Sequence, residues 1–350
     1  MINIDFESLR PIGLTPYIAQ QLLMMESCGQ NAVAARVIEI HRDRIVLHNG
    51  NIEFYARILP NADVEKLAVG DWVIVEQHPN NEFWICDRMQ PVTQITRRTQ
   101  DGNRQLLVSN VDTAILVMGL DNDFNLRRME RYLAIVQAAQ VTPIIVLTKQ
   151  DIVVDAEEKL AQITQRLPPH LTIYSVNALE QKTSGVLAPW LSAGQTLVLL
   201  GSSGAGKSTL TNGLTNSLQE TGAVRVGDSR GRHTTRSRSL HCCTSGACII
   251  DTPGLRSWSP DADEDALDIA FDDISSLALN CKFRNCQHND EPGCAVRGAI
   301  DDDRLHNYQK LLREIKRSQQ TALERIEERA KWKVLHKAAE VRTREKRKEY

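Results

Sequence analysis

The most constraining feature of this sequence is a glycine-rich octapeptide, GSSGAGKS at 201–208. It satisfies the pattern G-x-x-x-x-G-K-[ST], it follows the apolar run TLVLL, and it opens a predicted helix. Glycines at 201, 204 and 206 let the backbone curl until several N–H groups point inward at phosphate oxygens. The new helix adds the positive end of its dipole. The octapeptide therefore predicts a site for a nucleoside triphosphate.

Two side chains of this loop have more specific roles. Lys207 can bridge the β- and γ-phosphates, and Ser208 offers a hydroxyl to Mg²⁺. We assign the whole loop and the residue after it to nucleotide binding: Gly201, Ser202, Ser203, Gly204, Ala205, Gly206, Lys207, Ser208 and Thr209.

The tetrapeptide DTPG at 251–254 ends the next strongly apolar strand, CIID. Asp251 is placed to hold Mg²⁺ through water, and Gly254 can offer its N–H to the γ-phosphate where a side chain would crowd. Alone this pattern is weak, because such tetrapeptides occur in many turns. Its position two strands after the phosphate loop makes it much stronger.

Between these motifs lies a polar, basic segment, RVGDSRGRHTTRSRS at 225–239. We expect a nucleotide to order it. Thr234 or Thr235 would give its hydroxyl to Mg²⁺ and its N–H to the γ-phosphate, and the sequence does not choose between them. The alternative is a plain surface loop.

Base selection is predicted from TKQD at 148–151, at the end of the apolar run IIVL, where ligands bind in open α/β sheets. Asp151 can accept two hydrogen bonds from the guanine N1–H and 2-amino group, a donor pair that adenine lacks, and Lys149 can lie along the base. The motif resembles the N-K-x-D guanine motif of GTPases, with Thr148 in place of Asn. We therefore assign Thr148, Lys149, Gln150 and Asp151 to GTP, together with Asn177 and Ala178 of a loop that resembles the S-A-K guanine loop.

The order of these motifs is unusual, because the base-reading motifs precede the phosphate loop, which comes first in ordinary GTPases. Buried strands alternate with helical stretches from about residue 110, which predicts a doubly wound, mainly parallel sheet. A circular permutation reconciles the order with the site, since all the motifs then lie at strand ends on one edge of one sheet. The motifs TKQD and DTPG argue against the alternatives of a P-loop ATPase or a small-molecule kinase.

The segments outside the predicted sheet have signals of their own. Five short β-rich runs between residues 30 and 90 predict a small barrel, either an oligonucleotide-binding (OB) barrel or a generic one. The spacing C-x₄-C-x-H-x₅-C supplies three thiolates and one imidazole, which suits tetrahedral Zn²⁺ in a closed structural site. The predicted ligands are Cys281, Cys286, His288 and Cys294, and the alternative is a set of reduced, unliganded cysteines.

Together the barrel, TKQD, GSSGAGKST, GRHTT, DTPG and the cysteine spacing resemble the bacterial ribosome small-subunit-dependent GTPase A family. The resemblance implies an OB-like β-barrel that binds ribosomal RNA, a central α/β circularly permuted P-loop GTPase domain and a C-terminal helical zinc-binding domain. The resemblance also implies a role for this protein in late maturation of the small ribosomal subunit, with 16S rRNA as a binding partner. The predicted division is an N-terminal extension at 1–29, a barrel at 30–95, a GTPase domain at 96–272 and a zinc-binding domain with a basic helical tail at 273–350.

The predicted catalysis is slow without a partner. Many GTPases place a water-orienting Gln directly after D-x-x-G, whereas this chain has Leu255 there. His233, beside the switch threonines, is the candidate that orients water once the segment is ordered; the alternative is an ordinary loop histidine. We assign catalysis to His233, Lys207, Thr234 and Thr235. The rival hypothesis is a catalytically idle, nucleotide-dependent RNA-binding scaffold.

Charge and hydropathy add expectations about location. The net charge is -2, yet residues 304–350 hold 15 Lys and Arg against 7 Asp and Glu. This basic end suggests a polyanionic partner, and the alternative is a solvated charged helix. No apolar run reaches the ~18 residues of a membrane span, and no export signal is visible, so we expect a cytoplasmic protein without membrane contact. We also expect a monomer, although the sequence does not fix the oligomeric state.

Overall fold

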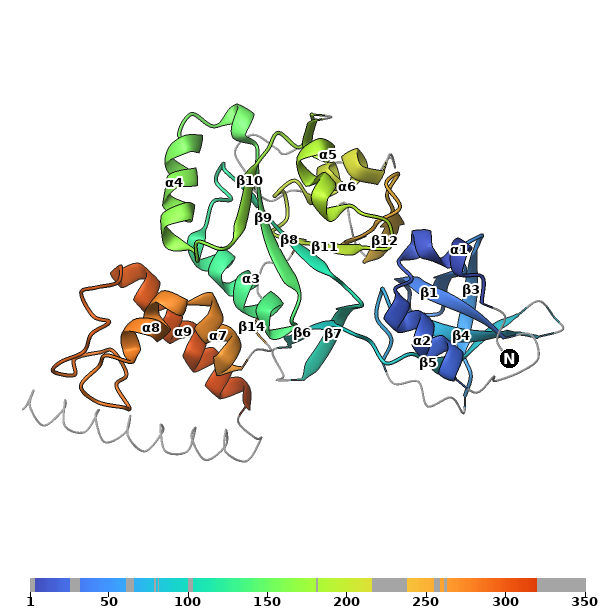
Figure 1. Ribbon diagram of the computed structural model, residues 1–350, viewed down its shortest axis with the longest axis horizontal. Coiled ribbons are helices and arrows are strands. Elements are labelled where there is room, and N and C mark those ends of the chain that lie inside the picture. Colours follow the sequence, from blue (N-terminus) through green and yellow to red (C-terminus); the bar gives the residue numbers. More distant parts are fainter. Residues whose placement is uncertain are drawn as a thin grey trace, which may run out of the picture.

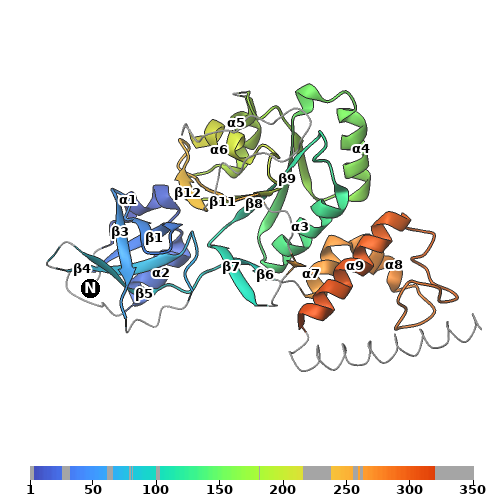
Figure 2. The ribbon, with the colours of Figure 1, turned by 180° about the vertical axis from the view of Figure 1, so that it is seen from behind.

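Three structural units follow one another along the longest axis of the molecule (Figures 1 and 2). A barrel lies at one end, an α/β core in the middle and a helical unit with the Cys/His cluster at the other end. The computed structural model describes residues 4–25, 32–60, 66–78, 80, 82–99, 103–180, 182–215, 238–254, 259–260 and 263–319.

The barrel has five strands, and the five predicted β-rich runs are confirmed. They are β1 (Ala32–Ile40), β2 (Ile45–His48), β3 (Glu53–Ile58), β4 (Trp72–Gln77) and β5 (Phe83–Arg88). The strand order is β1-β2-β3-β5-β4, and β1 also pairs with β4, so the sheet closes on itself. With β3 and β5 running parallel, this is the expected OB-like arrangement around an aliphatic interior.

A short helical segment covers one side of the barrel. It comprises α1 (Phe6–Leu9), the 3₁₀ turn η1 (Arg10–Ile12) and α2 (Pro16–Met24). The α2 helix begins where Thr15 accepts a hydrogen bond from the Ile18 N–H at 3.4 Å, with Pro16 in the first turn. Its buried residues Ile18 and Leu22 share a core with Trp72 of the barrel, so this segment packs as part of that unit.

The α/β core is a doubly wound sheet of order β10-β9-β8-β11-β13-β12, parallel except for β12. Its strands are β8 (Thr113–Gly119), β9 (Thr142–Thr148), β10 (Thr172–Ser175), β11 (Thr196–Gly201), β12 (Ser239–Cys242) and β13 (Cys248–Asp251). Its helices are α3 (Leu126–Ala138), α4 (Ala156–Arg166), α5 (Lys182–Leu187) and α6 (Lys207–Thr215), with 3₁₀ turns η2 (Gln150–Ile152) and η3 (Ala188–Trp190).

Helices cover both faces of this sheet, which explains why β8 is apolar throughout. Leu116 of β8 belongs to the core that contains Leu133 of α3, whereas its neighbour Ile115 belongs to the core that contains Leu210 of α6. Since β8, β9, β11 and β13 run parallel, their carboxyl ends lie at one edge. The predicted permuted sheet is confirmed.

The barrel and the core are joined through one continuous sheet, because β1 pairs with β12 at Glu39 and Ser239. Arg36 of β1 is fully buried at this junction. Its guanidinium donates to the carbonyl oxygen of Ile12 at 2.6 Å, to the Thr196 hydroxyl at 2.9 Å and to the carbonyl oxygen of Asn110 at 3.0 Å. A single side chain therefore binds the helical segment, the barrel and the core together.

A three-stranded sheet beside the core was not predicted. The hairpin of β6 (Gln94–Arg98) and β7 (Arg104–Ser109) pairs with β14 (Ser259–Pro260). Its strands are rich in Gln and Arg, so their apolar alternation is weak.

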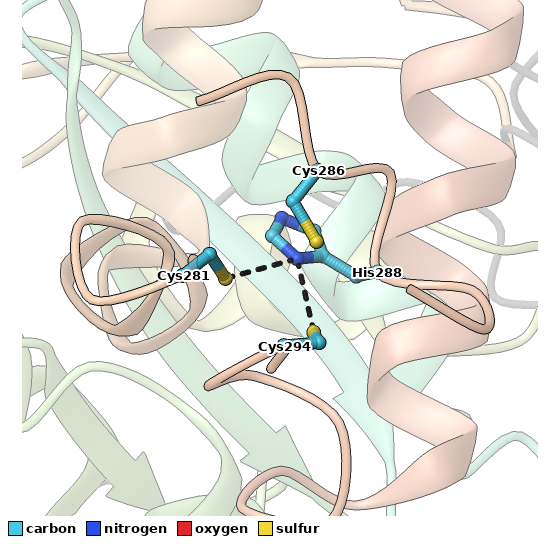
Figure 3. A group of neighbouring side chains, drawn as sticks. All are labelled: Cys281, Cys286, His288 and Cys294. Carbon is cyan, nitrogen blue, oxygen red and sulfur yellow. Dashed lines mark hydrogen bonds between the residues drawn. The ribbon is translucent and has the colours of Figure 1, made fainter. Parts of the chain in front are cut away.

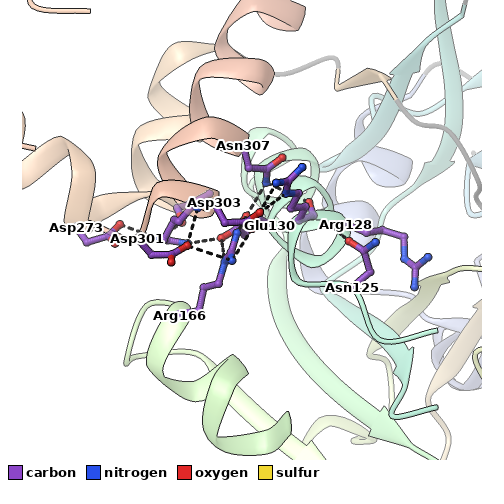
Figure 4. A network of polar contacts seen from close by, with 11 residues as sticks. Asn125, Arg128, Glu130, Arg166, Asp273, Asp301, Asp303 and Asn307 are labelled. Atoms are coloured by element: carbon purple, nitrogen blue, oxygen red, sulfur yellow. Dashed lines mark hydrogen bonds and ion pairs between the residues drawn. The ribbon is translucent and has the colours of Figure 1, made fainter. Parts of the chain in front are cut away.

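The helical unit contains α7 (Glu264–Ala270), α8 (Asp272–Ala278) and α9 (Asp302–Gln319). The α9 helix packs through an apolar stripe, since Leu305, Leu311 and Ile315 are buried. Glu130 of α3 lies fully buried at the contact of α9 with the core and accepts hydrogen bonds from Arg166 at 2.7 Å and Arg304 at 2.6 Å (Figure 4). No helix within the described ranges is both long and apolar enough to cross a membrane.

Candidate functional site

The phosphate loop connects β11 to α6 with backbone angles that favour glycine. Gly204 and Gly206 have φ of +82° and +99°. A Cβ at Gly201 would lie 2.4 Å from the carbonyl oxygen of Val117, so a side chain does not fit there. Glycines at these positions therefore allow the tight backbone curvature that the motif requires.

Lys207, the first residue of α6, is 6% exposed inside this loop. Its ammonium donates to the carbonyl oxygens of Gly201 at 3.1 Å and Ser202 at 2.7 Å. Burial lowers the pKa of Lys207 to about 8, while the nearby carboxylates of Asp251 and Asp123 act in the opposite direction. A desolvated cation at the base of an N–H cradle is suited to bind an anion.

The DTPG segment meets the phosphate loop directly. The Ser208 hydroxyl lies 3.3 Å from the carboxylate of Asp251, which is fully buried at the end of β13. A Cβ at Gly254 would lie 2.5 Å from the backbone nitrogen of Ser203, so the two segments touch at a glycine. A hydroxyl oxygen beside a carboxylate is a donor set that fits Mg²⁺.

The base-reading turn also reaches the phosphate loop. The hydroxyl of Thr148 donates to the carbonyl oxygen of Ala205 at 2.6 Å. A shorter Thr in the Asn position of the guanine motif therefore still bonds to the loop. Lys149 has a φ of +65° and pairs with Asp121 at 2.8 Å. Asp151 follows in η2 with an exposed side chain.

The remaining base-loop residues lie next to this turn. Gln150 accepts a hydrogen bond from the Ser175 hydroxyl at 2.8 Å, which connects the ends of β9 and β10. The Asn177 carboxamide accepts from the Leu179 N–H at 3.0 Å and shapes the following turn. The carbonyl oxygen of Ala178 faces α6, 3.9 Å from where a Cβ on Gly213 would stand. His233, Thr234, Thr235 and Leu255 lie outside the described residues.

Sequence reasoning missed two carboxylates at this edge. Asp121 binds Lys149, and Asp123 accepts a hydrogen bond from the Ser202 hydroxyl. Both follow β8, whose carboxyl end lies beside those of β9 and β11. A signal was present, because polar residues directly after a buried parallel strand fall at the ligand-binding edge.

The Cys/His cluster forms a second candidate site, in the helical unit (Figure 3). The ligand atoms of Cys281, Cys286, His288 and Cys294 all lie within 4.8 Å of one another. The His288 Nδ1 atom faces two sulfurs, 3.7 Å from Cys281 Sγ and 3.5 Å from Cys294 Sγ. Three thiols and one imidazole at this spacing fit a tetrahedral Zn²⁺ site.

Neighbouring groups hold this cluster in place. The Gln309 side chain of α9 donates to the carbonyl oxygens of Gln287 and His288, both at 3.2 Å. Although desolvation opposes it, hydrogen bonds from the backbone N–H of Arg297 and from His288 lower the pKa of the Cys294 thiol to about 7. This favours the thiolate, the form of cysteine that binds metal.

The chain is similar to known proteins over most of its length. A family model described as RsgA GTPase matches residues 89–260. The small ribosomal subunit biogenesis GTPase RsgA 2 of Vibrio parahaemolyticus is 41% identical over 319 residues, which cover 87% of this chain and 85% of that protein. The small ribosomal subunit biogenesis GTPase RsgA of Mesorhizobium japonicum is 40% identical over 316 residues, which cover 87% of this chain and 89% of that protein.

Two solved structures share the fold. YloQ, described as a circularly permuted GTPase, has a TM-score of 0.58 at 23% identity and covers 85% of this chain and 99% of its own. YjeQ from Thermotoga maritima has a TM-score of 0.59 at 21% identity, and the match covers 81% of this chain and 98% of that protein.

Proposed function

The chain belongs to the RsgA GTPase family, and from this membership we propose that it binds the small ribosomal subunit and hydrolyses GTP to GDP and phosphate during late maturation of that subunit. The observation that carries the proposal is the bond from Thr148 to Ala205 at 2.6 Å, which joins the base-reading turn to the phosphate loop. A purine and its triphosphate can thus be bound by one continuous surface.

Within that surface each segment has a distinct role. Asp151 accepts hydrogen bonds from the guanine N1–H and 2-amino group, and Lys149 lies along the base. The N–H groups of 201–208 and the ammonium of Lys207 bind the phosphates. Ser208 and Asp251 would hold Mg²⁺, which supplies charge compensation at the β- and γ-phosphates.

Hydrolysis needs an oriented water and a compensated charge on the transferred phosphoryl group. We assign the orienting role to His233 and the γ-phosphate contact to Thr234 or Thr235, because the position after DTPG holds Leu255, whose side chain cannot orient water. The subunit orders this segment and so accelerates a reaction that is slow alone. A partner that completes a GTPase site raises its rate by ~10³–10⁵-fold in known cases.

The other units supply binding. The barrel contacts 16S rRNA, and the Cys/His cluster holds one structural Zn²⁺ through Cys281, Cys286, His288 and Cys294. The four ranges 1–29, 30–95, 96–272 and 273–350 remain our proposed functional division. We further propose that the protein acts as a cytoplasmic monomer.

The test is phosphate release with purified small subunits. We expect the subunit to stimulate wild type strongly, Lys207→Ala to lose GTP binding, and His233→Ala to keep GTP affinity while losing stimulated turnover. Stimulated turnover that persists in His233→Ala with unchanged affinity would remove the catalytic assignment. GTP-dependent subunit binding without phosphate release in wild type would favour the rival, an idle RNA-binding scaffold. Large subunits serve as the control partner.

A further inference from the structure

Asp123 is a carboxylate that the proposed nucleotide contacts leave unused, although it lies beside the phosphate loop. Its Oδ1 atom accepts a hydrogen bond from the hydroxyl of Ser202, the second residue of the loop. Its Oδ2 atom accepts from the backbone N–H of Gly119, the last residue of β8, at 3.1 Å. The side chain therefore links the end of one core strand to the loop that follows the next.

Arg128 on α3 completes this arrangement. Its guanidinium pairs with the Asp123 carboxylate and also donates to the carbonyl oxygen of Asp123. The side chains of Asp123 and Arg128 are 13% and 25% exposed. Charges this far from water interact strongly, so Arg128 compensates a negative charge that would otherwise face bound phosphates.

Arg128 is itself carried on a helix that is fixed from the other side. Its neighbour Arg127 binds Asp303 of α9, and Arg131 binds Glu314 of α9. Glu130 bonds to Arg304 at the same contact (Figure 4). The carboxylate of Asp123 thus connects the phosphate loop to a helix that α9 holds in place.

We propose that Asp123 is a positioning residue for GTP: it holds the phosphate loop in its binding shape through Ser202, and Arg128 cancels the charge that Asp123 would present to the triphosphate. This inference rests on the proposed GTP site. It predicts that the three side chains act as one unit, so that their substitutions are not additive.

The experiment measures the Kd and number of GTP sites, and KM and kcat with small subunits, for single and double variants of the full chain. We expect Asp123→Ala and Ser202→Ala each to weaken GTP binding by about tenfold, the effect of losing a hydrogen bond to a charged group. The double variant should bind no worse than Asp123→Ala, since both remove the same bond. KM should rise with Kd, while kcat changes by less than about twofold.

A rescue distinguishes positioning from general loss of structure. Arg128→Ala should weaken GTP binding, because it leaves the Asp123 charge uncompensated. Adding Asp123→Asn should lower Kd by at least about threefold relative to Arg128→Ala, because the amide removes the charge while its one oxygen can still accept from Ser202. Glu264→Ala, which removes an exposed partner of Lys316 in the helical unit, is the matched control.

Three results would overturn the inference: additive effects of Asp123→Ala and Ser202→Ala, no restoration by Asp123→Asn, or fewer GTP sites at an unchanged Kd. If Lys207→Ala abolishes GTP binding while all the Asp123 variants bind normally, only this inference fails. If wild type does not bind GTP, the proposed function fails with it.

Discussion

At the scale of single residues, we propose that Asp151 selects guanine. Its carboxylate can accept two hydrogen bonds from the base, whereas an amide in its place accepts one and repels the second donor. We expect Asp151→Asn to weaken GTP binding by about tenfold to a hundredfold and to improve the relative binding of xanthosine triphosphate. Competition titrations with GTP, ATP and XTP measure this.

Asp155→Asn is the control for that substitution, because Asp155 pairs with Lys159 on the surface of α4. A variant Asp151→Asn that keeps the wild-type preference for GTP over XTP would show that the base is read elsewhere.

Some residues of the proposed nucleotide site could be predicted from the sequence, and others could not. Lys207, Ser208 and Asp251 belong to motifs whose local spacing encodes their chemistry, and the structure brings them together. Asp123 belongs to no motif. Its role depends on Ser202, 79 residues further along the chain, and nothing in the local sequence announces that contact.

At the scale of secondary-structure elements, α3 and α9 are joined by ion pairs that titrate in acid. The hydrogen bond from Arg127 to Asp303, together with Arg166 nearby, lowers the pKa of Asp303 to about 2 from its ordinary 3.8. Because the folded pKa is depressed, this contribution to stability is fully present above about pH 4 and is lost as pH falls towards 2.

We therefore expect Asp303→Asn to unfold more readily than wild type at pH 5 and the difference to shrink at pH 3. Urea unfolding at pH 5, 4 and 3 measures it, with Asp290→Asn as a control whose carboxylate pairs only at an exposed site. A difference that stays constant over this range would contradict the assignment.

Most elements could be predicted and some could not, for a physical reason. The strands β8, β9 and β11 are buried on both faces, so their composition alone marks them. The strands of the β6–β7 hairpin contain many Gln and Arg residues, so their composition does not mark them as strands. Their partner β14 is also distant in sequence. Long-range pairing of this kind leaves little trace in a local pattern.

At the scale of the whole molecule, the Cys/His cluster and the nucleotide pocket belong to different units and respond to different losses. Removal of the proposed Zn²⁺ by a chelator should loosen the loop at 281–294 and weaken small-subunit binding, because a metal bound by these three thiols and one imidazole would hold the loop together. GTP affinity should stay within about twofold, since Lys207 and Asp151 lie in the core.

Thermal melting measures the loss of structure, co-sedimentation measures small-subunit binding, and GTP titration measures GTP affinity. Re-addition of Zn²⁺ should restore both the structure and the subunit binding. Loss of GTP affinity equal to the loss of subunit binding would show that the metal also supports the core.

The junction between barrel and core has a mechanical consequence. Among the described residues, the β1–β12 pairing and the four hydrogen bonds of Arg36 tie these two units together. A partner that touches both must therefore offer two docking points at a matching separation and angle. We expect a subunit whose surface is still distorted to engage the two units less well than a finished one, because the tied units cannot adjust independently to it.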